Sequence, residues 1–339
     1  MKSSNIGGQA VMEGIMMRHG DIYSVGVRKP DGEIQIKVEP YKSLTKNSRF
    51  WKLPILRGMV AFVESLVVGM KCLMYSASFY EEEEEEQKKK EQMTREEREK
   101  EEARREKLDQ WLMRGTVAFS IVVSVALFIL LPYFAAGVLR RVTASETVIA
   151  IAEACVRMVL FLGYLLLISR MKDIQRVFMY HGAEHKCINC VEHGMNLTVE
   201  NVMKSSREHK RCGTSFLLFV MIVSILFFLF IRVSTPWLRV AVRLLLLPVI
   251  AGVSYEIIRL AGNSDNWLVT LLSKPGLALQ RLTTREPEPD MAEVAIQAVE
   301  AVFDWREYLR ENFPETEILE PGDCRENTDF GSAKEEAGA

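Results

Sequence analysis

The stretch YHGAEHKCINCVEHGMNLTVENVMKSSREHKRCGTSF (Tyr180–Phe216) follows one long apolar run, Val148–Ser169, and leads into another, Ser215–Val233. It contains four of the five histidines of the chain and three of its six cysteines. Apolar runs of this length are typical of membrane-spanning helices, and imidazole and thiolate groups are the usual ligands of transition metals. The stretch therefore predicts a polar segment between two spans and is the first candidate for a functional site.

Four apolar runs are each long enough to cross about 30 Å of hydrocarbon as a helix. They are Gly115–Leu139, Val148–Ser169, Ser215–Val233 and Leu238–Leu260. With 48% hydrophobic residues in a chain of 339, they indicate a mainly α-helical, polytopic membrane bundle of four spans. The net charge of −2 says nothing about partners, because the charged residues are concentrated in Glu81–Lys107.

Basic residues flank the spans unequally. One side carries Arg104, Arg105, Lys107, Arg114, Arg170, Lys172, Arg176, Lys186, Lys204, Arg207, Lys210 and Arg211, whereas the other side has only Arg140, Arg141, Arg232 and Arg239. The positive-inside rule then predicts a multi-pass protein of the cell membrane with both termini and the His/Cys loop in the cytoplasm. No secretory leader opens the chain, so we expect the cysteines to be free thiols or metal ligands.

The opening of the chain predicts a small cytoplasmic β unit. Two alternating runs, Ile22–Arg28 and Glu33–Glu39, flank Pro30-Asp31-Gly32, which supplies the φ values of a tight hairpin turn. Gly7-Gly8 and Gly14 either let the backbone approach an anion or substrate closely or only relieve crowding in turns. The second interpretation is favoured.

A helix is expected over Leu53–Ser78, where Arg57, Glu64 and Lys71 recur every seven residues on one stripe. We expect it to lie in the membrane interface or to pack against protein, rather than to cross completely. The predicted order of segments is a β unit (1–50), this amphipathic or partly inserted helix (51–78), a charged linker (79–110), the four-span bundle (111–260, including the His/Cys loop 170–214), a C-terminal segment with an amphipathic helix (261–313) and a disordered tail (314–339).

The centre of the His/Cys loop has the spacing of a metal site. His181 and His185 are four residues apart, which puts both imidazoles on one helix face, and Glu184 lies between them. The pattern matches H-x-x-E-H, in which the histidines bind zinc and the glutamate activates a water molecule. His209 and Cys212 follow in the same loop and could complete three or four ligands.

Two other interpretations of the loop stay open. Cys187 and Cys190 form a C-x-x-C pair, and His209 with Cys212 could close it into a structural zinc site. An open site at the two histidines would instead leave a position for water. The polar residues could also be ordinary packing beneath the membrane.

The segments GGQAVMEGIMMR, HGAEHKCINCVEHG, LTVENV, HKRCGTSF and QRLTTREP resemble the YqhQ family of bacterial membrane proteins, a family of unknown function described as predicted metal-dependent enzymes. The resemblance extends from Ile6 to about Phe303. It implies that the family pattern includes Glu13, His181, Glu184, His185, His209, Arg211, Cys212 and Thr283–Glu286. Cys187 and His19 depart from that pattern, which disfavours a family-wide C-x-x-C site.

These observations predict a metal-dependent enzyme, of hydrolase type, at the cytoplasmic membrane face, because a Lewis-acid metal beside a carboxylate activates water. The expected ion is a divalent metal, Zn²⁺, with His181, His185, His209 and Cys212 as ligands. Glu184 is the predicted general base, and Arg211 a partner for an oxyanion or phosphate. Glu13 completes the catalytic set, and we expect Glu13 or Glu256 to approach the pair of histidines.

One rival is a non-enzymatic membrane scaffold or assembly protein with a structural metal. Another is a transporter that uses Glu153, Arg157, Arg243 and Glu256, but the chain has no evident inverted repeat. In each case the expected partner is the lipid bilayer, together with a second copy of the chain or another membrane protein, and not nucleic acid.

Overall fold

The computed structural model describes residues 2–46, 48–80, 95–231, 233, 235–262 and 266–319. The chain divides into two compact units, each assembled from separate stretches of sequence. The first unit combines Met1–Lys42, Arg176–His209 and Thr284–Ala339, and the second combines Ser43–Gln175 and Lys210–Thr283. Most of the predicted tail, from residue 320, and residues 81–94 of the predicted linker lie outside the described residues.

The first unit is built on a four-stranded antiparallel sheet of order β1-β2-β3-β4. Its strands are β1 (Gly7–Val11), β2 (Gly14–His19), β3 (Ile22–Arg28) and β4 (Ile34–Pro40). The predicted hairpin is confirmed: β3 and β4 pair from Ile22↔Pro40 to Arg28↔Ile34, and Gly32 adopts a φ of 89° in the turn. The hairpin β1–β2 was not predicted separately, and Glu13 turns it with a φ of 47°.

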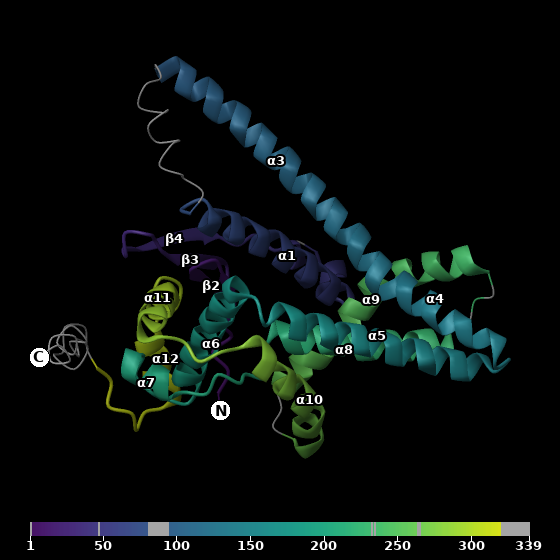
Figure 1. Cartoon of the computed structure of the whole chain (residues 1–339). Helices are drawn as coiled ribbons and strands as arrows, with labels where there is room; N and C mark the ends of the chain where they lie inside the picture. Colours follow the sequence, from purple (N-terminus) through teal and green to yellow (C-terminus); the bar gives the residue numbers. More distant parts are fainter. Residues whose placement is uncertain are drawn as a thin grey trace, which may run out of the picture. The chain divides into compact units, whose positions relative to one another are not determined.

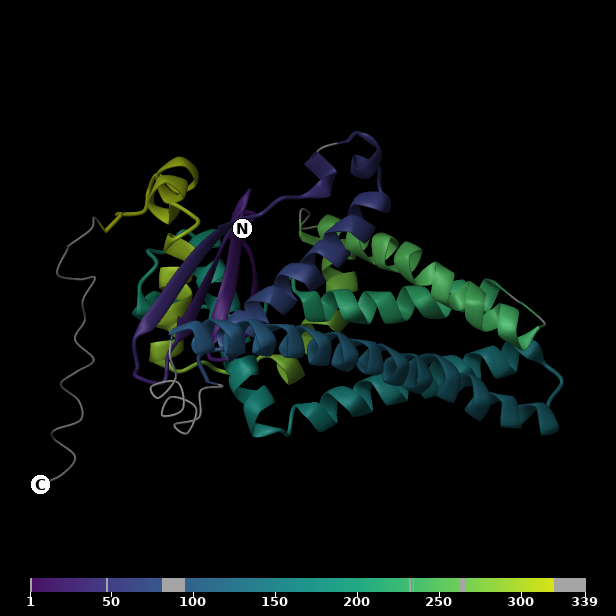
Figure 2. The ribbon, with the colours of Figure 1, turned by 90° about the horizontal axis from the view of Figure 1, so that it is seen from above.

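Four helices complete the described part of the first unit: α6 (Lys172–Glu192), α7 (Val199–Lys204), α11 (Pro289–Glu300) and α12 (Trp305–Asn312). Helix α11 contacts β2 and β3, and in Figure 2 it lies alongside the purple strands. The contact is close, because a Cβ on Gly26 of β3 would lie 3.3 Å from Val294 and Ala298. The apolar face expected on α11 is buried at Met291, Val294, Ala295, Ala298 and Val299, and it shares one core with β2 and α6.

The start of α11 is fixed by its own first turn and by β3. The helix has Glu288 as N-cap and Pro289 in its first turn, where a missing N–H costs nothing. Asp290 Oδ1 accepts a hydrogen bond from Met291 N (2.9 Å), and Glu293 pairs with Arg28 at 3.0 Å instead of closing a capping box. These residues therefore tie α11 to β3.

The second unit consists almost entirely of helices (Figure 1). They are η1 (Leu44–Lys46), η2 (Phe50–Lys52), α1 (Leu56–Ala77), α3 (Arg95–Val125), the π-helical turn η3 (Ala126–Leu130), α4 (Leu131–Gly137), η4 (Val138–Arg141), α5 (Glu146–Ile168), α8 (Gly213–Phe230), α9 (Pro236–Gly262) and α10 (Trp267–Thr283). Small residues allow the close contact of α1 with α9, since a Cβ on Gly252 would lie 2.5 Å from the carbonyl oxygen of Ile55.

Five helices of the described chain are long and apolar enough to cross a membrane, as a multi-pass membrane protein requires. Four match the predicted spans: Trp111–Gly137, Glu146–Ile168, Gly213–Phe230 and Trp237–Gly262. The fifth is α1, the helix predicted to be interfacial or partly inserted. The mainly α-helical bundle with a small N-terminal β unit is thus confirmed, and the charged segment from Arg95 continues without a break into the first span as α3 (Figure 1).

Candidate functional site

Helix α6 presents His181, Glu184 and His185 on one face, because spacings of three and four residues coincide on a helix. The ring centroids of His181 and His185 are 4.4 Å apart, and His185 is buried. Nδ1 of His185 lies 2.6 Å from the carbonyl oxygen of Arg207. A carbonyl only accepts, so Nδ1 carries the proton and Nε2 keeps the lone pair that a metal needs.

Two further residues of α6 hold the loop that follows α7. Lys186 Nζ donates to the carbonyl oxygens of Met203 (2.7 Å) and Ser205 (2.8 Å), and it pairs with Glu286 at 2.6 Å. Asn189 Nδ2 donates to the carbonyl oxygens of Ser206 (2.6 Å) and Glu208 (3.0 Å). These contacts fix residues 203–208 against α6 and thereby position His209. Sequence reasoning missed both residues, because their acceptors are main-chain atoms.

His209 lies beside the pair of histidines, with its ring centroid 5.8 Å from that of His185. Its Nε2 is 3.3 Å from Oε2 of Glu192, whose side chain is fully buried. The other carboxylate oxygen of Glu192 accepts hydrogen bonds from the backbone N (2.8 Å) and Oγ (2.9 Å) of Ser4. The N-terminal segment thus holds the carboxylate that orients His209, an arrangement typical of metal-binding histidines. Glu192 and Ser4 were not among the predicted site residues.

Two glycines of the quoted motifs are explained by close approaches around α6. A Cβ on Gly8 of β1 would lie 2.8 Å from Cγ and Cδ of Glu184, so Gly8 makes room for this buried carboxylate. A Cβ on Gly182 would lie 2.0 Å from the carbonyl oxygen of Arg285, where the TTREP segment crosses the helix. The backbone N–H of Arg285 donates to the carbonyl oxygen of Phe178 (2.9 Å). The opening, the HGAEH helix and the TTREP segment therefore meet within one unit.

Glu13, at the tip of the β1–β2 hairpin, faces α6 one turn before His181. Its carboxylate forms a two-point ion pair with Arg176 and accepts a hydrogen bond from the hydroxyl of Tyr180 (3.4 Å). Burial, followed by the charge of Glu13, raises the pKa of Tyr180, and the hydrogen bonds to Glu13 raise the pKa of Arg176. The partners of Glu13 within this unit are thus a guanidinium and a phenol.

Cys187 and Cys190 lie in the core of the first unit, both with no exposed surface. Burial raises the pKa of the Cys187 thiol, and it raises the pKa of Cys190 to about 12. Cys190 Sγ donates to the carbonyl oxygen of Asn196 (3.3 Å), as a protonated thiol does. Both cysteines are thus neutral thiols enclosed in the apolar core of the first unit.

The remaining predicted residues belong to the second unit. Cys212 is buried at the N-cap of α8, where its Sγ accepts from Thr214 N (3.3 Å). The side chain of Arg211 packs against Gly262, and Glu256 forms an ion pair with Arg57 of α1. His181, His185 and His209 lie together in the first unit, whereas Cys212 belongs to the second.

Comparisons with known proteins are consistent with these motifs. The family model described as "Protein of unknown function (DUF1385)" matches residues 53–305. The "Uncharacterized protein YqhQ" of Bacillus subtilis (strain 168) is 38% identical over 294 residues, which cover 86% of this chain and 90% of that protein. No solved structure matches the chain. On the extent of both matches, this chain belongs to the YqhQ family, whose domain carries the description DUF1385.

Proposed function

We propose that this membrane protein is a metal-dependent enzyme whose metal is bound by His181 and His185. The observation that carries the proposal is the hydrogen bond from His185 Nδ1 to the carbonyl oxygen of Arg207, which leaves Nε2 as the free ligand atom beside the ring of His181. His209 and Cys212, which follow in the same loop, are the proposed further ligands. Two or three imidazoles and at most one thiolate suit Zn²⁺, which we propose as the ion.

Hydrolysis is the chemistry that such a donor set supports best. Zn²⁺ supplies a Lewis acid that lowers the pKa of a water molecule. Glu184, one position before His185 and on the same face of α6, is the proposed general base for that water. We propose that Arg211 stabilises the negative charge that develops on the substrate, and that Glu13 acts as a positioning residue by holding Arg176 and Tyr180.

The test is elemental analysis of the full-length protein purified in detergent. We expect about one equivalent of Zn²⁺ in the wild type and a large loss in the His181→Ala/His185→Ala double variant. His193→Ala is the matched control, since His193 is exposed on the same segment and should keep its metal. An equal metal content in the wild type and the double variant would contradict the proposal.

The third ligand can be identified after replacement of the native ion by Co²⁺. A thiolate ligand gives a sulfur-to-cobalt charge-transfer band in the near ultraviolet, which imidazole alone does not. We expect the band in the wild type and in His209→Ala, and its loss in Cys212→Ser. Retention of the band in Cys212→Ser would remove Cys212 from the ligand set.

A non-enzymatic scaffold with a structural metal is the second candidate function. The observation that favours it is the number of side chains, His185, Lys186 and Asn189, that fasten residues 203–208 to α6. A closed site of four protein ligands supports the scaffold, whereas an open position occupied by water supports the enzyme. X-ray absorption at the zinc edge distinguishes the two coordination shells.

For localisation, we propose that both termini and the His/Cys loop lie on the cytoplasmic side of the cell membrane. Supporting this, Met1–Lys42, Arg176–His209 and Thr284–Ala339 belong to one compact unit and so must share one side. The number of complete crossings between residues 42 and 176 is then even. If the candidate spans Trp111–Gly137 and Glu146–Ile168 both cross, α1 does not cross completely, in keeping with its expected interfacial placement.

Single cysteines placed at residue 2 and after Glu286, in a background without native cysteines, test this topology. Both are expected to react with a membrane-impermeant thiol reagent only after the cells are opened. Labelling of the residue-2 cysteine in intact cells would contradict the proposed orientation.

A further inference from the structure

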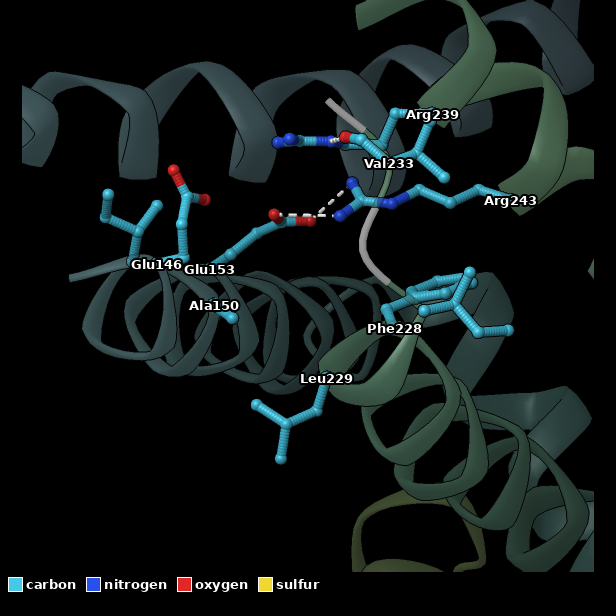
Figure 3. A pocket seen from close by; sticks show the side chains of 10 residues that line it. Glu146, Ala150, Glu153, Phe228, Leu229, Val233, Arg239 and Arg243 are labelled. Carbon is cyan, nitrogen blue, oxygen red and sulfur yellow. Dashed lines mark hydrogen bonds and ion pairs between the residues drawn. The ribbon is translucent and has the colours of Figure 1, made fainter. Parts of the chain in front are cut away.

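A second polar site lies among the membrane-spanning helices, near the starts of α5 and α9. It is a small cavity of about 40 Å³, with Glu146 and Glu153 from α5, Phe228 from α8, and Arg239 and Arg243 from α9 in its lining (Figure 3). Glu146 is exposed, whereas Glu153 is buried seven residues further, about 10 Å along the helix at 1.5 Å per residue. The cavity therefore leads from the helix ends into the span.

The inner part of this pocket carries excess positive charge. One carboxylate, Glu153, is shared by two arginines: Arg157 Nη2 donates to Oε1 (2.8 Å) and Arg243 Nη2 donates to Oε2 (2.9 Å). All three side chains are at least nine-tenths buried, with exposed fractions of 8%, 4% and 8%. At the rim, Glu146 and Arg239 add one charge of each sign. The described groups thus leave one positive charge in apolar surroundings, where an unbalanced charge is costly.

Arg243 lies between Glu153 and the pocket. Its Nη1 lies 2.5 Å from Oε1 of Glu153, beside the hydrogen bond from Nη2 to Oε2, so its guanidinium pairs with both carboxylate oxygens. The guanidinium lines the pocket beside Phe228, and its centre is 5.0 Å from that ring. Arg239, one turn earlier on the same face of α9, is half-buried. Its Nε donates to the carbonyl oxygen of Val233 (2.8 Å), and its guanidinium lies 5.2 Å from the ring of Tyr133.

We propose that this pocket binds a phosphate-bearing anion, with Arg243 and Arg239 as its hydrogen-bond donors. A single negative charge balances the excess of the Glu153/Arg157/Arg243 group. The planar guanidinium fork matches the oxygens of a phosphate, and the pocket lies at the ends of the candidate spans α5, α8 and α9, where a headgroup phosphate would be found. The anion comes either from the phosphodiester of an anionic lipid or from free phosphate. The site shares no residue with the proposed metal centre and does not depend on it.

The test uses the full-length protein in phosphatidylcholine nanodiscs. One arm raises the fraction of phosphatidylglycerol, and the other adds inorganic phosphate to discs of phosphatidylcholine alone. Native mass spectrometry counts retained lipid, and the midpoint of thermal unfolding reports binding of either anion. Stabilisation by phosphatidylglycerol alone identifies a lipid headgroup, and stabilisation by inorganic phosphate identifies a free anion. Stabilisation by neither overturns the proposal.

Variants decide whether the anion binds in this pocket. Arg243 is buried and ion-paired, so its loss also endangers the fold, and the test therefore relies on Arg239. Arg239→Gln is expected to weaken binding about tenfold or more, since it removes a charged hydrogen-bond donor. Arg141→Gln, at an exposed arginine outside the pocket, is the control and should bind as the wild type does. Glu146→Gln should bind more tightly, because it removes a negative charge from the rim. Equal binding by Arg239→Gln and the wild type would overturn the proposal.

Discussion

In the first unit, the buried side chains of Lys186 and Asn189 on α6 donate to main-chain carbonyl groups, whereas in the second unit Glu153, Arg157 and Arg243 are satisfied mainly by one another. The residue 203–208 loop has carbonyls that no helix uses. In a membrane helix, the carbonyl groups already accept the hydrogen bonds of the helix itself. Charged side chains there must therefore pair with side chains of other helices. The exception supports this reasoning: Arg157 Nε donates to the carbonyl oxygen of Phe128 (3.1 Å), which lies in the π-helical turn η3.

The largest expected effect comes from removing the shared carboxylate in the second unit. Glu153→Gln leaves Arg157 and Arg243 buried without a counter-charge, and we expect a loss of about 4 kcal/mol in the free energy of unfolding. Arg243→Gln leaves a neutral Glu153–Arg157 pair and should cost about 2 kcal/mol. Thermal unfolding in detergent compares the two variants. Equal losses would show that the charge balance of the group is not what stabilises it.

In the first unit, the most sensitive position is a glycine. Gly182→Ala brings a Cβ to 2.0 Å from the carbonyl oxygen of Arg285 and should cost about 3 kcal/mol, with loss of the crossing of residues 284–287 over α6. Gly163→Ala is the matched control on α5, because no described atom lies within 4 Å of its Cβ, and alanine favours a helix. Limited proteolysis and thermal unfolding should separate the two. A stable Gly182→Ala variant would contradict the close approach.

The two regions also differ in how far sequence predicted them. The length of the apolar runs was sufficient to predict the spans. The turn sequence Pro30-Asp31-Gly32 was sufficient to predict the β3–β4 hairpin. Helix α10 was not anticipated, because Pro275 and Gly276 interrupt its pattern. The β1–β2 turn depends on a positive φ at Glu13, a residue without the conformational freedom that would mark a turn.

For the site, the four-residue spacing correctly indicated that His181 and His185 share a helix face. The spacing could not indicate which interactions hold the site residues in place. The bond from Ser4 to Glu192 spans 188 residues, and the acceptors of Lys186 and Asn189 are carbonyl oxygens of a loop. Main-chain acceptors are the same for every residue type, so no side-chain pattern records them. Likewise, the sequence placed Glu153, Arg157 and Arg243 in the spans but could not indicate that the two arginines share one carboxylate.

A smaller effect on the free energy of unfolding should appear in the alkaline pH range, and it should come from the first unit. Burial raises the pKa of Cys190 from 9.0 to about 12, so above pH 9 the unfolded chain loses this proton and the folded chain keeps it. The free energy of unfolding should therefore fall as the pH rises, and Cys190 alone should contribute about 1 kcal/mol to this fall between pH 9 and 10. Cys190→Ala should show a shallower fall over this range. A slope identical to that of the wild type would mean that the thiol is not held in its neutral form.

The smallest expected effect is that of a substitution at Ser4. This substitution tests whether His209 binds the metal. Ser4→Ala removes one of the two hydrogen bonds from Ser4 to Glu192, while the backbone N–H bond of 2.8 Å remains, so the cost should be about 1 kcal/mol. Ser3→Ala, at a half-buried serine, is the control. Competition with a chelator measures Zn²⁺ affinity in the same samples. If His209 binds the metal, a less firmly held Glu192 should also lower that affinity by about tenfold, as is typical when the partner of a metal-binding histidine is disturbed. If stability falls while affinity is unchanged, His209 only packs beside His185, and the metal depends on His181, His185 and Cys212.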